Sequence, residues 1–160
     1  MYSLFSTAEP VSKLLKDRGQ TIAVSESAAG GLIAAALLSV EGASSYFLGG
    51  ATVYTQIARR ELLQLSKSQV KMRGASESYA LITAEAIRDK MGADWGIGES
   101  GAAGPLGNRY GDAAGHVALG VVGPVKMSRT LETGNTNREQ NMWSFCNAAM
   151  DLLYEAIGRS

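Results

Sequence analysis

Ser27 lies in a stretch, SESAAGG at residues 25–31, whose residue types can carry out acyl-transfer chemistry. The stretch follows a short β-branched segment and precedes an alanine-rich one, so it sits at the carboxyl end of a predicted strand and opens a predicted helix. Ligands of open α/β sheets bind at that edge. A helix N-terminus offers unpaired N–H groups and a positive dipole end, which suit an anion or a developing oxyanion. The stretch predicts either a nucleophilic Ser27 or a small-residue turn that caps a closely packed helix.

A second stretch, SGAAGPLGN at residues 100–108, also follows a predicted strand. Its glycines allow several backbone N–H groups to converge, as they do in phosphate-binding nests. Long loops without regular structure in compact domains are usually functional or disordered. We interpret the stretch as a loop that faces a ligand, with a flexible surface loop as the alternative.

Helical and extended patterns alternate along most of the chain and must position these two stretches. The predicted helices span 6–19, 28–39, 56–65, 76–91 and about 142–156, and the predicted strands span 21–25, 46–54, 95–100, 116–122 and 127–133. This alternation predicts an α/β fold, a three-layer α/β/α sandwich with a mostly parallel mixed sheet and one antiparallel strand. No linker or repeat interrupts the pattern, so we expect a single domain over residues 1–160.

Local signals set several of these boundaries. The sequence Ser6-Thr7-Ala8-Glu9 is typical of a capping box that opens the first helix, and Gly19 is a natural stop for it. Ser76 has the residue type of a helix N-cap. Gly49 and Gly50 fall inside a predicted strand and indicate a bulge or a close backbone approach. The polar segment 66–75 is predicted to be a loop.

The composition excludes several classes of partner. Of the 160 residues, 46% are hydrophobic and 19% are charged, an ordinary balance for one globular domain. The 15 basic and 15 acidic residues cancel, so no basic field indicates nucleic acid and no polybasic run indicates a membrane surface. A net charge of zero also favours self-association. This agrees with a homo-oligomer.

The numbers of cysteines and histidines indicate the cellular compartment and restrict the metal sites that the chain can form. The single cysteine, Cys146, excludes an intrachain disulfide, suits a reducing compartment and lies on the apolar face of the last predicted helix. Charged residues interrupt the first twenty positions where a signal peptide would be apolar, and the longest apolar stretch, 28–40, is too short to span a bilayer. We expect a cytoplasmic protein. One histidine and one cysteine cannot build a zinc site, so we expect no metal and no cofactor.

Six short motifs occur in order along almost the whole chain. They are Glu26-Ser27-x-x-Gly30-Gly31, Ala43-Ser44-Ser45-x-Phe47, Val53-Tyr54, Gly74-Ala75-Ser76-Glu77, Ser100-Gly101-x-Ala103-Gly104-Pro105 and Gly115-x-Val117. Together they resemble the CinA C-terminal domain family, which includes the nicotinamide mononucleotide deamidases, and the resemblance covers roughly residues 6–158. Each motif alone is weak, and their order and spacing make the resemblance specific for the fold and the family.

The resemblance implies a three-layer domain, often dimeric or larger, that hydrolyses the carboxamide of nicotinamide mononucleotide to the nicotinate nucleotide and ammonia without a metal. The partner is thus a small-molecule nucleotide. Ser27 matches the family nucleophile and Tyr54 matches a tyrosine on the second strand. The residues expected to bind or face the nucleotide are Glu26, Gly30, Gly31, Ser45, Ser100, Gly101, Ala103, Gly104 and Arg138.

The chain departs from the family pattern next to these residues. The family commonly has Cys-Thr where this chain has Ala28 and Ala29, and Arg59 stands where the family has a lysine. A desolvated lysine can accept the serine proton, whereas arginine stays charged and can only clamp an anion such as phosphate. Losing a general base typically costs on the order of 100- to 10,000-fold in rate. A paralogue that binds a nucleotide without turning it over is therefore the alternative.

Other residues are candidates for the roles left open. His116 is the one side chain with an ordinary pKa near neutrality, so an amidohydrolase with another substrate and His116 as base is a further reading; a half-buried strand histidine is the alternative. Glu26 can orient the turn or, if burial raises its pKa, act as base. Arg138 and Arg109 can contact a phosphate, and Arg138 can also be an exposed residue at a helix start. The predicted catalytic set is Ser27, Tyr54, Arg59 and His116.

Overall fold

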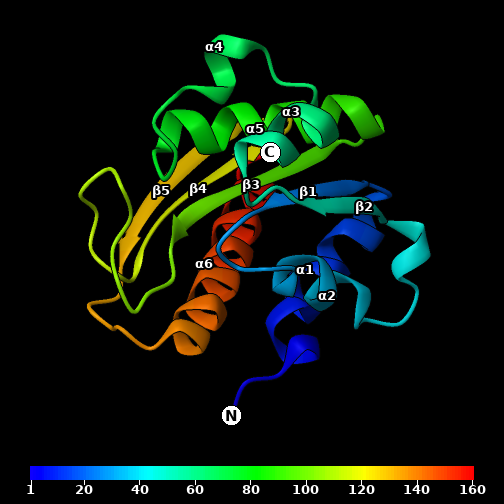
Figure 1. Ribbon diagram of the computed structural model, residues 1–160. Coiled ribbons are helices and arrows are strands. Elements are labelled where there is room, and N and C mark those ends of the chain that lie inside the picture. The colour runs from blue at the N-terminus through cyan, green and yellow to red at the C-terminus, as the bar shows by residue number, and fades with distance from the viewer.

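A five-stranded sheet lies between two layers of helices in the computed structural model, which describes residues 1–160 (Figure 1). The helices are α1 (Leu4–Arg18), α2 (Leu32–Leu38), α3 (Gln56–Leu63), α4 (Lys67–Val70), α5 (Glu77–Met91) and α6 (Arg138–Gly158), with a 3₁₀ turn η1 (Ala43–Ser45). The strands are β1 (Ile22–Glu26), β2 (Phe47–Thr52), β3 (Trp95–Ala102), β4 (His116–Val122) and β5 (Lys126–Glu132).

The strand order β2-β1-β3-β4-β5 makes a mixed sheet. β1 runs parallel to β2 and β3, and β4 runs antiparallel to both β3 and β5. β4 alone therefore opposes the other four strands, which confirms the predicted architecture. The chain leaves β1 towards β2 on one side and returns to β3 on the other, so β1 and β3 flank a topological switch point, where ligands of open α/β sheets bind.

The two faces of the sheet are covered unequally. α1, α2 and α6 cover one face, and α5, with α3 and α4 beside it, covers the other (Figure 1). The larger apolar core lies under α1, α2 and α6 and contains Phe145, Leu152 and Cys146, so the predicted core position of this cysteine is confirmed. A smaller core lies under α3 and α5, around Tyr79 and Ile87. No helix of this chain combines the length and the apolarity that crossing a membrane requires.

Glycines in the sheet let α5 approach it closely. A Cβ added at Gly98 on β3 would lie 2.0 Å from the Ala80 carbonyl oxygen, and one added at Gly96 would lie 2.1 Å from the Ala84 carbonyl oxygen. These distances are far below van der Waals contact, so the backbone of α5 rests directly on the strand. Glycine is required at such a close backbone approach.

We predict that Gly98→Ala lowers the free energy of unfolding by about 2–3 kcal/mol, because the methyl group must displace the α5 backbone. Gly158→Ala is the matched control, since a Cβ there meets nothing within 4 Å. Urea unfolding of the two variants measures the difference. If both variants unfold at the same urea concentration, α5 accommodates the methyl group without a loss of stability, and the prediction is wrong.

Some predicted boundaries are wrong. Ser3, not Ser6, caps α1: the Ser3 side chain accepts a hydrogen bond from the Ser6 N–H at 3.3 Å, and a bond from Thr7 N–H to the Ser3 carbonyl at 3.2 Å closes the first turn. The predicted stop at Gly19 is confirmed by its left-handed φ of 61°. The predicted loop 66–75 contains the short helix α4, which a capping box at Ser66 opens.

The glycines of β2 mark the predicted irregularity. Ile22 pairs with Phe47 while the next residue, Ala23, pairs with Gly49, so Leu48 is an extra residue at a bulge. A Cβ added at Gly50 would lie 3.0 Å from the Val24 carbonyl oxygen on the neighbouring strand. Both parts of the prediction, the bulge and the close approach, are thus confirmed.

Candidate functional site

A cleft of about 370 Å³ opens near the carboxyl ends of β1, β2 and β3, at the switch point of the sheet. It is lined by Ser27, Tyr54, Thr55, Gln56, Arg59, Ala75, Ser100, Gly101, Asn108, Arg109 and Tyr110. The cleft brings together six residues that the sequence singled out, Ser27, Tyr54, Arg59, Ser100, Gly101 and Arg109. Two arginines and no aspartate, glutamate or histidine line it, so its charge suits an anionic ligand.

The turn that carries Ser27 is held from one side by Glu26. This buried carboxylate accepts hydrogen bonds from the backbone N–H groups of Gly31 at 2.8 Å, Ile33 at 3.1 Å and Ala34 at 2.9 Å. Glu26 thus caps α2, whose N-cap residue Gly31 has no side chain to do so. Burial raises the pKa of Glu26, and the three N–H groups oppose the rise. Glu26 does not line the cleft.

Glu99 on β3 holds the turn from the other side, and sequence reasoning missed it. Its Oε2 accepts hydrogen bonds from the N–H groups of Ser27 at 2.8 Å and Ala29 at 2.9 Å. Its Oε1 is buried without a partner. Burial is the main influence and raises the pKa of Glu99 to about 7, while the backbone N–H groups of the turn oppose the rise. The sequence signal was the one charged residue of this strand.

The two carboxylates use the N–H groups that the sequence offered to a ligand. The N–H groups of Ser27, Ala29, Gly31, Ile33 and Ala34 all donate to Glu26 or Glu99. The expectation that this helix start presents unpaired N–H groups to an anion is therefore wrong for these positions, because the protein supplies its own anions.

The glycines of the turn also serve its own geometry. Gly30 N–H donates to the Ser27 carbonyl at 3.1 Å, and Gly30 and Gly31 adopt left-handed φ angles of 67° and 103°. This conformation delays the helix predicted from residue 28 until Leu32. Neither glycine lines the cleft. The turn is thus a rigid support that places Ser27 at the cleft.

We predict that Glu99→Gln removes a pH dependence of stability. The folded pKa of Glu99, about 7, lies above its ordinary value of 4.5, so its contribution to stability is complete below about pH 4.5 and is lost as the pH rises through about 7. Glutamine keeps an oxygen for the two N–H groups but does not titrate. The free energy of unfolding of the original protein should therefore fall relative to the variant across this window. Urea unfolding at several pH values measures this difference. If the free energies of unfolding of the two proteins change with pH in parallel, the raised pKa does not belong to Glu99.

Arg59 on α3 is buried at the cleft with only 7% of its surface exposed. Its guanidinium lies over the Tyr79 ring, 4.7 Å from the ring centroid. Its Nε and Nη1 are buried and have no hydrogen-bond acceptor. No salt bridge pairs this charge.

Tyr110 also lines the cleft and was not predicted as a site residue, whereas its neighbour Arg109 was a predicted phosphate contact. Arg109 Nη2 donates a hydrogen bond to the Tyr110 hydroxyl at 2.8 Å. Burial raises the pKa of Tyr110, but the hydrogen bond from Arg109, together with the nearby Gly74 N–H and Arg59 guanidinium, outweighs it, so the net pKa is lowered. Asn108 Oδ1 accepts from the Tyr110 N–H at 3.0 Å and so shapes this part of the loop. The run Asn-Arg-Tyr was the available sequence signal.

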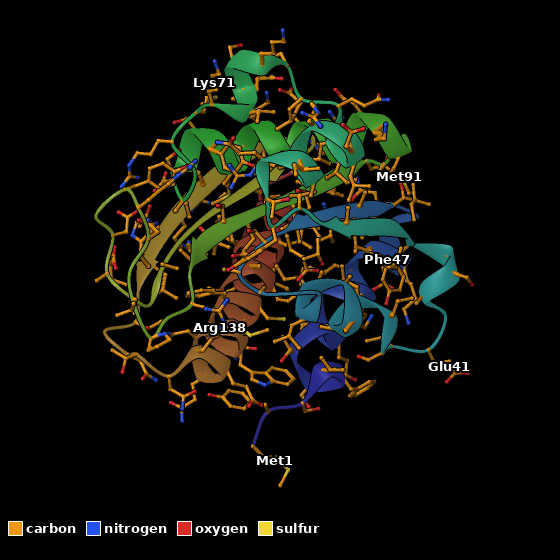
Figure 2. All side chains as sticks on the ribbon, in the orientation of Figure 1. Met1, Glu41, Phe47, Lys71, Met91 and Arg138 are labelled. Atoms are coloured by element: carbon orange, nitrogen blue, oxygen red, sulfur yellow. The ribbon has the colours of Figure 1, made fainter.

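Arg138, which Figure 2 labels, is the first residue of α6, and its side chain joins this helix to two other segments of the chain. Its Nη2 donates to the Tyr54 hydroxyl at 3.2 Å and its Nη1 donates to the Gly104 carbonyl at 2.5 Å. Arg138 does not line the cleft itself. It therefore positions Tyr54, which is otherwise more than half exposed.

His116 lies outside the residues that line the cleft. Its Nε2 is hydrogen-bonded to the Ala75 carbonyl at 2.7 Å and its Nδ1 to Glu132, with Asp112 at 3.7 Å from Nε2. Burial lowers the pKa of His116, but these partners outweigh it and raise the pKa overall. Both ring nitrogens are thus occupied in holding the segment around Ala75, and the geometry does not offer His116 to a ligand.

Three of the remaining predicted residues, Ser100, Ala103 and Ser45, make hydrogen bonds within the protein. Ser100 Oγ, in the cleft, accepts a hydrogen bond from the Ala75 N–H at 3.0 Å. The Ala103 carbonyl accepts from Asn141 Nδ2 at 2.7 Å, and neither Ala103 nor Gly104 lines the cleft. Ser45 lies in η1, bonded to the Gly42 carbonyl, and is not part of the cleft either. No group of three or more His, Cys, Asp or Glu side chains is arranged to hold a metal ion.

Comparison with known proteins identifies relatives of the whole domain. The model of the CinA C-terminal domain matches residues 4–157. A CinA-like protein of Prochlorococcus marinus is 41% identical over 120 residues, which are 74% of this chain and 28% of that relative. A CinA-like protein of Chlorobium phaeobacteroides is 38% identical over 156 residues, 93% of this chain and 37% of that relative. The chain thus spans about a third of the length of these curated relatives.

Solved structures match the fold. A competence-damaged protein (CinA) superfamily protein from Klebsiella pneumoniae superposes with a TM-score of 0.91 at 24% identity, covering 99% of this chain and 100% of that one. The competence/damage inducible protein CihA from Agrobacterium tumefaciens superposes with a TM-score of 0.87, covering 97% of this chain and 95% of that one. At this level of identity the likeness is one of fold.

Proposed function

Because the chain belongs to the CinA C-terminal domain family, we propose that its cleft binds nicotinamide mononucleotide and that Ser27 attacks the carboxamide of this nucleotide. The products are the nicotinate nucleotide and ammonia. The supporting observation is the placement of Ser27, which lines the cleft on a turn fixed from both sides by the buried carboxylates of Glu26 and Glu99. A nucleophile held this rigidly loses little entropy on reaching its target.

The reaction has two steps. The Ser27 oxygen adds to the carboxamide carbon as its proton leaves, the C–N bond then breaks, and the nitrogen departs as ammonia with the proton. An ester between Ser27 and the nicotinoyl group remains. Water hydrolyses this ester, which restores the serine and releases the carboxylate. Arg59 supplies positive charge to the oxyanion that develops in each step.

The proton of Ser27 needs an acceptor other than Arg59, whose guanidinium stays protonated. Two phenols line the cleft, and each accepts a hydrogen bond from an arginine: Tyr110 from Arg109 and Tyr54 from Arg138. For Tyr110, the N–H donated by Arg109 favours the phenolate form. The lowered pKa of Tyr110 makes it the stronger candidate. Since only a small fraction of a phenol ionises near neutral pH, turnover is slow.

A second candidate function is nucleotide binding without turnover. The charge of the cleft favours it, because Arg59 cannot accept a proton and no carboxylate or histidine lines the cleft. Such a protein would use the same residues to hold an anionic ligand.

One experiment separates the two functions. The purified chain is incubated with nicotinamide mononucleotide, ammonia is measured, and the melting temperature is recorded with and without the nucleotide. Ammonia released in proportion to enzyme supports the amidohydrolase. A raised melting temperature without ammonia release supports binding alone. If the nucleotide causes no ammonia release and no rise in melting temperature, both functions are contradicted.

A further inference from the structure

Arg59 is a buried cation without an anion. Only 7% of its surface is exposed, its Nε and Nη1 have no acceptor, and the other charged residue that lines the cleft, Arg109, is also positive. The face of Tyr79 offers a weak cation–π contact at 4.7 Å. A buried charge that lacks a partner is costly, so proteins usually pair it. Arg59 lines the cleft, so a ligand bound there can supply the missing partner.

Other anion-binding groups at the cleft are already used. The N–H groups at the start of α2 donate to Glu26 and Glu99, so that helix end cannot take a ligand anion. Asp112, a carboxylate in the same loop as Arg109, pairs with Arg73 at 2.6 Å and not with Arg59. Arg59 therefore remains available, and Arg109, which lines the same cleft, adds a second guanidinium.

We infer that Arg59 is an oxyanion-binding subsite, with Arg109 as its second cation, and that the cleft selects ligands bearing a carboxylate or a phosphomonoester over their neutral counterparts. A guanidinium offers two parallel donors that match a carboxylate or phosphate edge. The inference rests on the proposed function only in taking the cleft as the ligand site.

The selectivity has a consequence for the proposed reaction. If Arg59 faces the reacting end of the nucleotide, the carboxylate product binds more tightly than the carboxamide substrate. If it faces the other end, it holds the phosphate. Both sources present the same oxyanion chemistry, and simple probes distinguish them.

The test uses the full chain and three probes: inorganic phosphate, nicotinate and nicotinamide. Nicotinamide matches nicotinate in shape and lacks the charge. We expect phosphate or nicotinate to raise the melting temperature and nicotinamide to leave it unchanged. If phosphate alone stabilises the protein, the group that binds Arg59 is the phosphomonoester. If nicotinate stabilises it, the group that binds Arg59 is the carboxylate.

Variants assign the effect to Arg59. Arg59→Gln should weaken anion binding at least about tenfold, because a charge-assisted hydrogen bond is lost. Arg60→Gln is the matched control on the same helix, since Arg60 is exposed and pairs with Glu61. Arg59→Lys keeps the positive charge but loses the planar guanidinium, so the affinity for the anion should fall several-fold. This variant tests the inference if Arg59→Gln does not fold.

Two results would overturn the inference: no stabilisation of the original protein by either anion, or unchanged affinity in both Arg59 variants. The outcome is independent of turnover. Anion binding at Arg59 without ammonia release leaves the inference standing and removes the proposed function, whereas ammonia release without anion binding does the reverse.

Discussion

Replacing Ser27 with alanine should reduce ammonia release from nicotinamide mononucleotide on the order of 1,000-fold or more, because no other group can form the ester intermediate. The substitution removes only the hydroxyl oxygen. The backbone N–H of residue 27 still donates to Glu99, so the turn and the cleft should persist. The melting temperature should stay within a few degrees of the original, and the nucleotide should still bind. Ammonia release under saturating nucleotide measures the loss.

Ser25→Ala is the matched control for this experiment. Ser25 lies two residues away on β1, and its hydroxyl is buried without a hydrogen-bond partner. Its removal should leave ammonia release unchanged. Ammonia release that persists in Ser27→Ala would mean that water, activated elsewhere in the cleft, attacks the carboxamide directly, and the covalent mechanism would be wrong.

Replacing Arg59 with lysine should increase ammonia release on the order of 100-fold, the lower range of a general-base contribution. The lysine amine would occupy a buried site in the same cleft as the cation Arg109, and both burial and a like charge lower an amine pKa. A fraction of the amine would then be neutral near pH 7 and able to accept the Ser27 proton, which a guanidinium cannot do. The rate should rise with pH, since the base acts in its neutral form. Initial rates across a pH series measure both effects.

Arg60→Lys controls for a general effect of the substitution on α3, because Arg60 is exposed beside Arg59. The double variant Ser27→Ala, Arg59→Lys should be inactive, since a base without its nucleophile cannot form the ester. A lysine variant with an unchanged or lower rate would show that position 59 does not reach the serine proton. In that case the role of position 59 is confined to charge.

The order of the elements could be predicted from the sequence. The apolar run from His116 to Val122 predicts β4 to the residue, and Ser76 predicts the cap of α5. These signals are local, because burial periodicity and capping involve residues within a few positions of each other. The start of α2 was misplaced because alanines favour a helix from residue 28, while Glu26 and Glu99 hold residues 27–31 in a non-helical turn.

The site was partly predictable for the same reason. Ser27 could be placed at a strand end, and the family motifs added Tyr54 and the position of Arg59. The gathering of these residues into one cleft depends on the switch point between β1 and β3, and the alternating pattern of the sequence predicts such a sheet without giving its strand order.

The sequence by itself determined the fold class, the family and the chemistry that Ser27 and Arg59 can and cannot perform, since these follow from residue type and spacing. Only the tertiary structure decided what each group faces. Parallel pairing of Ser25 with Gly98 places the Glu99 carboxylate beneath the Ser27 turn, where it takes the N–H groups that a ligand would have used. Strand pairing joins residues that are far apart in the chain. No local pattern can therefore reveal that Glu99 accepts hydrogen bonds from the Ser27 turn, or that Arg59 is left without an anion.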